Sequence, residues 1–169
     1  WSVVRKTRRA TAMRSDKSEG VSRVRAIEYR SYGGPEVLEM VEVPEPVPGA
    51  GEVRIAVKAA GLNPVDWKIF SGMMGDDASA LPRGVGRDYA GVVDAVGEGV
   101  ASVAVGDAVL GTARSAPGRG MDAGALADGL VVAADAVVRK PDALDFIRAA
   151  SLGVAVEAAT GALRALDVT

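Results

Sequence analysis

The stretch Gly61-Leu62-Asn63-Pro64-Val65-Asp66-Trp67-Lys68-Ile69-Phe70-Ser71-Gly72 marks the passage from a strand to a helix. The residues before it, 52–59, alternate apolar and polar side chains, as a half-buried strand requires. Asn63 is a strong N-cap residue, Pro64 suits the first helical position, and Asp66 in the first turn suits the helix dipole. The sequence therefore predicts a strand that leads into a capped helix, a place from which side chains reach a cleft. Taken alone, the motif is more simply explained by a cap at Asn63 and a solvated Lys68, because caps are commonplace.

Short strands separated by Gly and Pro fill the chain up to Pro141, which is typical of a barrel or a sandwich. After Pro141 the composition shifts to Ala, Leu and acidic residues, and this shift predicts helices. We expect 38–43 to pair with 52–59, and the Pro-rich residues 44–51 between them to form a loop. The expected strands cover 24–29, 38–43, 52–59, 89–96, 108–110, 130–133 and 137–139, and the expected helices 145–152 and 154–166.

Charge separates residues 1–23 from the rest of the chain. They hold seven basic residues and two acidic ones without apolar periodicity, so we expect a disordered basic leader, more simply an upstream extension than an export or transit signal. The remaining residues hold thirteen basic and twenty acidic residues, a net charge of minus seven that argues against nucleic-acid binding. No apolar run reaches the roughly 20 residues of a membrane span. We therefore expect a cytoplasmic protein that does not enter a membrane.

The 169 residues contain no Cys and no His, which excludes disulfides, thiol nucleophiles, imidazole bases and thiolate or imidazole zinc sites. Any chemistry is left to carboxylates, Lys, Tyr, hydroxyls and amides. Asp76 and Asp77 are adjacent, but without further convergent oxygens we interpret them as a solvated loop pair instead of a cation site.

Six further motifs extend the pattern along the chain. They are Tyr32-Gly33-Gly34-Pro35-Glu36-Val37-Leu38, Gly86-Arg87-Asp88-Tyr89-Ala90-Gly91, Val105-Gly106-Asp107-Ala108-Val109, Gly124-Ala125-Leu126-Ala127-Asp128, Lys140-Pro141 and Ala149-Ala150-Ser151-Leu152. In this order they resemble the zinc-free medium-chain dehydrogenases/reductases, the group of quinone oxidoreductases and enone reductases. The resemblance implies a mainly β fold with some α: a GroES-like, partly open β-barrel over 24–141, with short helices. It also implies a helical segment over 142–169 that leads toward a Rossmann cofactor domain absent from this chain.

The same resemblance assigns roles to residues. Zinc alcohol dehydrogenases of the superfamily carry Cys at the position of Asn63 and His-Glu at Arg87-Asp88, so the resemblance implies a zinc-free site. Zinc-free relatives use NADPH to reduce quinones or enones. We predict Asn63 and Lys68 as catalytic donors, with Asp66 orienting Lys68 or capping the helix. The predicted substrate-binding residues are Trp67, Tyr89 and Arg87, and the predicted cofactor contacts are Asn63 and Ala158.

Two functions from different classes follow from these observations. The first is an NADPH-dependent quinone or enone oxidoreductase that is inactive without a cofactor domain, with a homo-oligomer or a separate cofactor domain as its partner. The alternative is a stand-alone barrel that serves as an interaction module or is a remnant, and relation to an enoyl-reducing module of a larger synthase also stays open. The near-matches to a dinucleotide fingerprint at Gly97-Glu98-Gly99 and at 118–123 lack the required strand and helix context. We also expect the apolar helix over 154–166 to be exposed and to promote self-association.

Overall fold

The computed structural model describes residues 2–5, 21–113 and 124–168, and the structural statements below concern these residues. Most of the predicted leader, residues 6–20, and the near-match at 118–123 lie outside them. The strands are β1 (Ser2–Arg5), β2 (Arg23–Tyr29), β3 (Leu38–Pro44), β4 (Glu52–Leu62), β5 (Arg83–Gly84), β6 (Asp88–Val96), β7 (Ala108–Thr112), β8 (Gly129–Ala133) and β9 (Val137–Arg139). The helices are α1 (Pro64–Phe70), α2 (Phe146–Ala149) and α3 (Gly153–Ala165), with short 3-10 turns at η1 (Pro35–Val37), η2 (Ala78–Ala80) and η3 (Ala134–Ala136).

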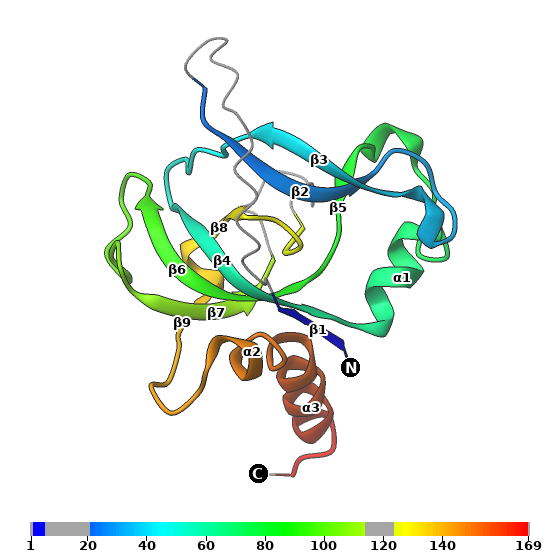
Figure 1. Cartoon of the computed structure of the whole chain (residues 1–169). Helices are drawn as coiled ribbons and strands as arrows, with labels where there is room; N and C mark the ends of the chain where they lie inside the picture. The colour runs from blue at the N-terminus through cyan, green and yellow to red at the C-terminus, as the bar shows by residue number, and fades with distance from the viewer. Residues whose placement is uncertain (1, 6–20, 114–123, 169) are drawn as a thin grey trace.

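The strands form two antiparallel sheets that face each other (Figure 1). The larger sheet has the order β1-β4-β6-β7-β9, and β8 also pairs with β4; the smaller sheet has the order β3-β2-β5. Backbone hydrogen bonds from the segment before β8 join the sheets, because Ile27 N donates to Leu126 O and Val57 N donates to Asp128 O. The predicted mainly β fold with a partly open barrel and short helices is confirmed.

Three details differ from the prediction. First, β3 pairs with β2 along their full lengths and not with β4. The Pro-rich loop explains this, because it carries the chain from one sheet to the other instead of closing a tight hairpin. Second, Ser2–Arg5 form a strand against Ala59–Leu62 of β4, so the expected disorder is wrong for these four residues. Third, α2 spans only Phe146–Ala149, a single turn begun by Asp145, whose side chain accepts from Arg148 N.

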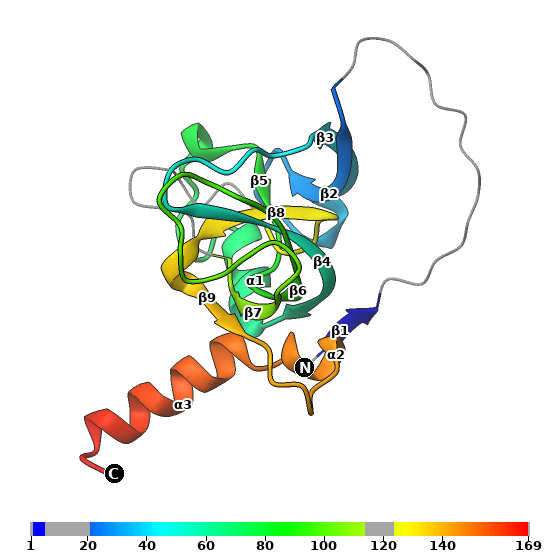
Figure 2. The same ribbon diagram turned by 90° about the vertical axis from the view of Figure 1, so that its left-hand side faces the viewer.

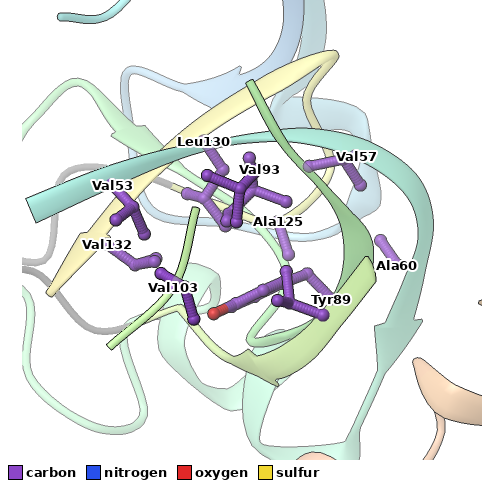
Figure 3. Close-up of a cluster of buried hydrophobic side chains, with 11 residues drawn as sticks. Val53, Val57, Ala60, Tyr89, Val93, Val103, Ala125, Leu130 and Val132 are labelled. Atoms are coloured by element: carbon purple, nitrogen blue, oxygen red, sulfur yellow. The ribbon is translucent and has the colours of Figure 1, made fainter. Parts of the chain in front are cut away.

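The main core lies on the inner face of the larger sheet and is built by the inward side chains of β4, β6, β7 and β8 (Figure 3). As predicted, the alternation in β4 buries Val53, Ile55 and Val57 and leaves Lys58 exposed. Two smaller clusters fasten the helices. Four alanines (Ala59, Ala90, Ala149 and Ala150) pack α2 on the larger sheet. Tyr29, Phe70 and Val85 join α1 to the smaller sheet, with the rings of Tyr29 and Phe70 edge to face at 6.3 Å.

Helix α3 extends away from the barrel (Figure 2). None of its residues is buried, and apolar side chains such as Val156, Leu163 and the following Leu166 are exposed, the last to 72%. The expected exposure of this helix is therefore confirmed. Its self-association stays a prediction.

Two glycines test how closely these elements pack. At Gly61, a Cβ atom would collide with the carbonyl oxygen of Ala150, whereas at Gly161 on α3 it would meet open space. We expect Gly61→Ala to lower the free energy of unfolding by about 1–3 kcal/mol, as overpacking does. Gly161→Ala should raise it by about 0.5–1 kcal/mol, since alanine is the better helix former. Urea unfolding of both variants measures this, and equal effects of the two substitutions would contradict the described packing.

Candidate functional site

The site begins where β4 ends and α1 starts. Asn63 is the N-cap of α1 with extended backbone, and its main-chain N–H donates to Asp66 Oδ2 at 2.6 Å. The Asp66 N–H in turn donates to the Asn63 carbonyl at 3.0 Å. Both side chains are buried. The sequence prediction of a strand that leads into a capped helix is confirmed.

A buried carboxylate joins this cap to two other elements. Asp88, the first residue of β6, is only 1% exposed. Its Oδ2 accepts from Asn63 Nδ2 at 3.0 Å, and its Oδ1 accepts from the main-chain N–H of Val154 at 2.9 Å. Val154 lies in the first turn of α3, where the helix dipole favours a negative charge. Asp88 therefore connects β6, α1 and α3 through one side chain.

Small residues surround this carboxylate because the backbones approach closely. A Cβ atom on Gly153 would lie 2.5 Å from Asp88 Oδ1 and 2.9 Å from Thr112 Cγ2. The Thr112 hydroxyl donates to Glu157 Oε1 at 3.2 Å, which gives the barrel a second polar contact with α3, this one from β7. The start of α3 is thus fixed to the barrel, although the rest of the helix is exposed.

Burial raises the pKa of both carboxyls in this cluster. For Asp88 the main cause is desolvation, which the hydrogen bonds from Asn63 and Val154 oppose. For Asp66 desolvation also comes first, the hydrogen bond from the Asn63 main chain opposes it, and the charge of Asp88 raises the pKa further. The positive charge of Arg87 lowers the pKa of both groups. Coupled buried carboxyls of this kind are often found at functional sites.

The structure separates Lys68 and Trp67 from the buried cluster. Asp66 and Phe70 face inward, whereas Lys68 and Trp67 are exposed, the latter to 46%. Side chains two positions apart on an α-helix are rotated by about 200° around its axis, so they lie on nearly opposite faces. Of the two roles predicted for Asp66, orienting Lys68 does not fit this geometry, whereas capping the helix is confirmed. Lys68 and Trp67 lie on the outer side of α1.

Tyr89 and Ala158 also lie away from the cluster. Tyr89 is fully buried in the main core, and its hydroxyl has no hydrogen-bond partner in the described part of the chain (Figure 3). The prediction of Tyr89 as a substrate-binding residue is therefore wrong, because its ring fills the barrel. Ala158 is exposed on α3. Arg87 is half-buried and lines the same pocket as Asp66, and its role in substrate binding stays a prediction.

Sequence reasoning did not find the central role of Asp88. The sequence did contain a signal for this role, because Asp88 is a charged residue at the start of an otherwise apolar strand. A charged side chain is buried only when hydrogen-bond or charge partners compensate it. The contacts of Thr112 and Glu157 had no sequence signal, since they depend on how α3 meets β7.

Comparison with known proteins places this architecture. Residues 49–142, more than half of the chain, match the family described as the alcohol dehydrogenase GroES-like domain. The chain belongs to this family. The match begins just before β4 and ends just after β9, so it covers the larger sheet apart from β1, together with α1.

Among the relatives of this GroES-like chain are quinone oxidoreductases. The quinone oxidoreductase of Lama guanicoe is 38% identical over 132 residues, which are 78% of this chain and 38% of the relative. The structure of the quinone oxidoreductase from Coxiella burnetii matches with a TM-score of 0.78 at 34% identity, over 88% of this chain and 46% of that one. The Escherichia coli quinone oxidoreductase complexed with NADPH matches with a TM-score of 0.63 at 35% identity, over 75% and 36%. The chain spans less than half the length of these relatives, and its predicted resemblance to them is confirmed.

In the described residues no three His, Cys, Asp or Glu side chains are grouped as metal ligands would be. No helix in residues 2–5, 21–113 or 124–168 is long and apolar enough to cross a membrane.

The hydrogen bond between the Asn63 amide and the Asp88 carboxylate can be tested by exchanging the two side chains. Asn63→Asp places two carboxylates where an amide donates at 3.0 Å, so we expect it to lower the free energy of unfolding by about 1–3 kcal/mol at neutral pH. The double variant N63D/D88N restores one donor and one acceptor, because Asn at position 88 donates to Asp at position 63 and still accepts from Val154. We therefore expect it to recover most of the loss.

Urea unfolding of the wild type, both single variants and the double variant gives the coupling free energy of the pair. Asn63→Leu serves as the control, because it leaves Asp88 Oδ2 without its donor and adds no charge. Combining it with Asp88→Asn removes the buried charge but restores no hydrogen bond, so this pair should recover less stability than N63D/D88N. An N63D/D88N variant no more stable than the sum of its single changes would contradict the assigned hydrogen bond.

Asp66→Asn tests the electrostatics of the cap. The substitution keeps an acceptor for the Asn63 N–H and removes a desolvated charge. A folded-state pKa above the ordinary 3.8 means that Asp66 binds its proton more tightly in the folded chain than in the unfolded chain. Proton binding at Asp66 therefore contributes fully to folding stability below pH 3.8, and this contribution is lost as pH rises through the folded-state pKa. We expect the stability of Asp66→Asn relative to wild type to increase between pH 3 and pH 7. A relative stability that stays constant or falls over this range, measured by urea unfolding at each pH, would reject the raised pKa.

Proposed function

We propose that this chain is the GroES-like catalytic part of a zinc-independent, NADPH-dependent oxidoreductase that reduces quinones or enones. The proposal is supported by the similarity to quinone oxidoreductases at 34–38% identity and by the polar cluster at the α1 cap. We further propose a cytoplasmic location and small-molecule substrates, without a nucleic-acid or membrane partner.

The Asn63–Asp88 pair is the observation that carries the proposal. Together with Arg87, the pair stands where the resemblance places the Cys and the His-Glu pair of zinc alcohol dehydrogenases. These three residues fill that place with an amide, a guanidinium and a carboxylate. Asn63 Nδ2 uses one of its two N–H groups on Asp88, which leaves the other for an oxygen acceptor. A fixed donor of this kind stabilises negative charge that develops on a carbonyl oxygen during reduction.

The described residues fit only part of a dinucleotide. All their strand pairs are antiparallel, whereas a pyrophosphate is held by a parallel β-α-β unit with a Gly-rich turn. We propose that Asn63 and the exposed Ala158 border the nicotinamide and that a separate dinucleotide-binding domain, to which 142–169 leads, holds the remainder. Bound NADPH would supply the hydride.

The remaining predicted residues keep their proposed roles around the capped helix. Half-buried Arg87 lies beside the capped helix and would orient or polarise a carbonyl group. Trp67 offers an exposed flat apolar surface for a ring, and Lys68 offers an exposed ammonium that would deliver a proton. Asp66 and Tyr89 have structural roles in this proposal.

A chimera tests the proposal directly. Residues 21–168 of this chain are joined to the dinucleotide-binding domain of the Escherichia coli quinone oxidoreductase, a relative 35% identical in the matched structure. We expect NADPH oxidation with a benzoquinone or an α,β-unsaturated ketone that is insensitive to chelators. Asn63→Ala should lower kcat by roughly 10²–10³-fold, the usual loss for one donor to a developing oxyanion.

The matched control is Lys58→Ala on the exposed face of β4, which should leave kcat unchanged. A chimera that folds and binds NADPH but reduces none of these substrates would contradict the proposed activity. That result would favour the non-enzymatic interaction module.

A further inference from the structure

A groove opens where the two sheets separate. β8 lies between β2 and β4 (Figure 1) and pairs with β4 only as far as Ala56. The segment before β8 crosses to β2, where Ala127 forms a bridge with Ala26. The groove between β2, β4 and this segment has a volume of about 230 Å³. Its walls are apolar and consist of Ile27, Met40, Val57 and Leu126 together with five alanines.

Lys58 lies at this groove because β4 contains a bulge. Val57 pairs with Gly91 of β6 and Ala59 pairs with the adjacent Ala90, so Lys58 is an extra residue in the ladder between these strands. A bulge changes the direction of a side chain, and bulges are frequent next to active sites. Here Lys58 lines the groove together with Val57 and Ala59.

The charged side chains of the groove leave one positive charge in excess. Arg25 and Asp128 form an ion pair, in which Arg25 Nε donates to Oδ2 at 3.0 Å and Nη2 donates to Oδ1 at 3.5 Å. Lys58 is the third charged residue of the lining, and it is exposed. No described residue forms a hydrogen bond or an ion pair with its side chain. The ammonium group of Lys58 is therefore available to a negatively charged ligand.

Met40 gives the groove an adaptable wall. It is the cross-strand partner of Ile27, so both side chains lie on the same face of the smaller sheet. Met40 is apolar and yet 70% exposed. Its flexible thioether side chain can pack against ligands of different shape. An apolar ligand in the groove would remove this exposed surface from water, which is favourable.

We propose that this groove binds a small monocarboxylic acid, whose apolar body lies between β2 and β4 and whose carboxylate pairs with Lys58. Apolar walls with one charged group are the usual way in which a pocket orients such a ligand. The volume is below the roughly 300–1,000 Å³ of sites for drug-sized molecules, so we expect a short chain or a single ring. The groove shares no lining residue with the cluster of Asn63, Asp66 and Asp88, so the inference is independent of the proposed reaction.

Octanoate binding to the 169-residue chain tests the groove, with 1-octanol as an uncharged probe of equal chain length. Two-dimensional ¹H–¹⁵N NMR spectra recorded during each titration report both the affinity and the site. We expect saturable octanoate binding that shifts the amide signals of Ala26, Lys58 and Ala127. Octanoate should bind roughly three- to fivefold more tightly than octanol, which is the effect of one exposed ion pair.

Two variants separate the charge from the apolar wall. Lys58→Gln should lower the affinity for octanoate to that for octanol and leave octanol binding unchanged. Met40→Ala should weaken the binding of both probes alike. The matched controls are Lys68→Gln and Met73→Ala, since both residues are exposed and neither lines the groove. These controls should bind both probes as the wild type does.

The proposal is overturned if octanoate binding does not saturate, or if the shifted amides lie on the exposed helix α3 instead of the groove. It is also overturned if octanol binds as tightly as octanoate, or if Lys58→Gln behaves like Lys68→Gln. Either of the last two results would mean that the groove is apolar surface without a preference for acids.

Discussion

The carboxylate of Asp88 is the interaction on which the arrangement of this chain depends. Taking an ionised carboxyl out of water is expensive unless its oxygens find donors, and here each oxygen has one. One donor belongs to the cap of α1 and the other to the first turn of α3, so the cost of burial is offset only while both helices are docked. The barrel, the capped helix and the start of α3 are in this way made interdependent.

This constraint also explains the chemistry of the site. A thiolate and imidazole set would hold a metal at this place, whereas the amide of Asn63 and the carboxylate of Asp88 hold each other. The pair leaves one N–H of Asn63 for an acceptor and keeps Arg87 beside a buried negative charge. We propose that the positions at which the resemblance places the zinc ligands of alcohol dehydrogenases serve here to join helices and to present a hydrogen-bond donor.

The sequence predicted the strands, the capped helix and the family well, because each rests on local rules. Alternation fixed β4, Asn63 with Pro64 fixed the start of α1, and ordered motifs indicated the barrel. It failed where an outcome depends on distant contacts. The pairing of β3 is set by which sheet the Pro-rich loop reaches, and Tyr89 sits in the core because β6 turns it inward. The hydrogen bond between Asp88 and Val154 joins residues 66 positions apart, which no local pattern reveals.

Native-state hydrogen exchange at the Val154 amide tests the central claim most directly. If Asp88 anchors α3, this amide exchanges nearly as slowly as the barrel amide of Val93, which donates to the Asp107 carbonyl at 2.9 Å. Asp88→Ala should then expose the Val154 amide while the Val93 amide stays protected relative to it. Fast exchange at Val154 in the wild type, with Val93 protected, would contradict the anchoring role of Asp88.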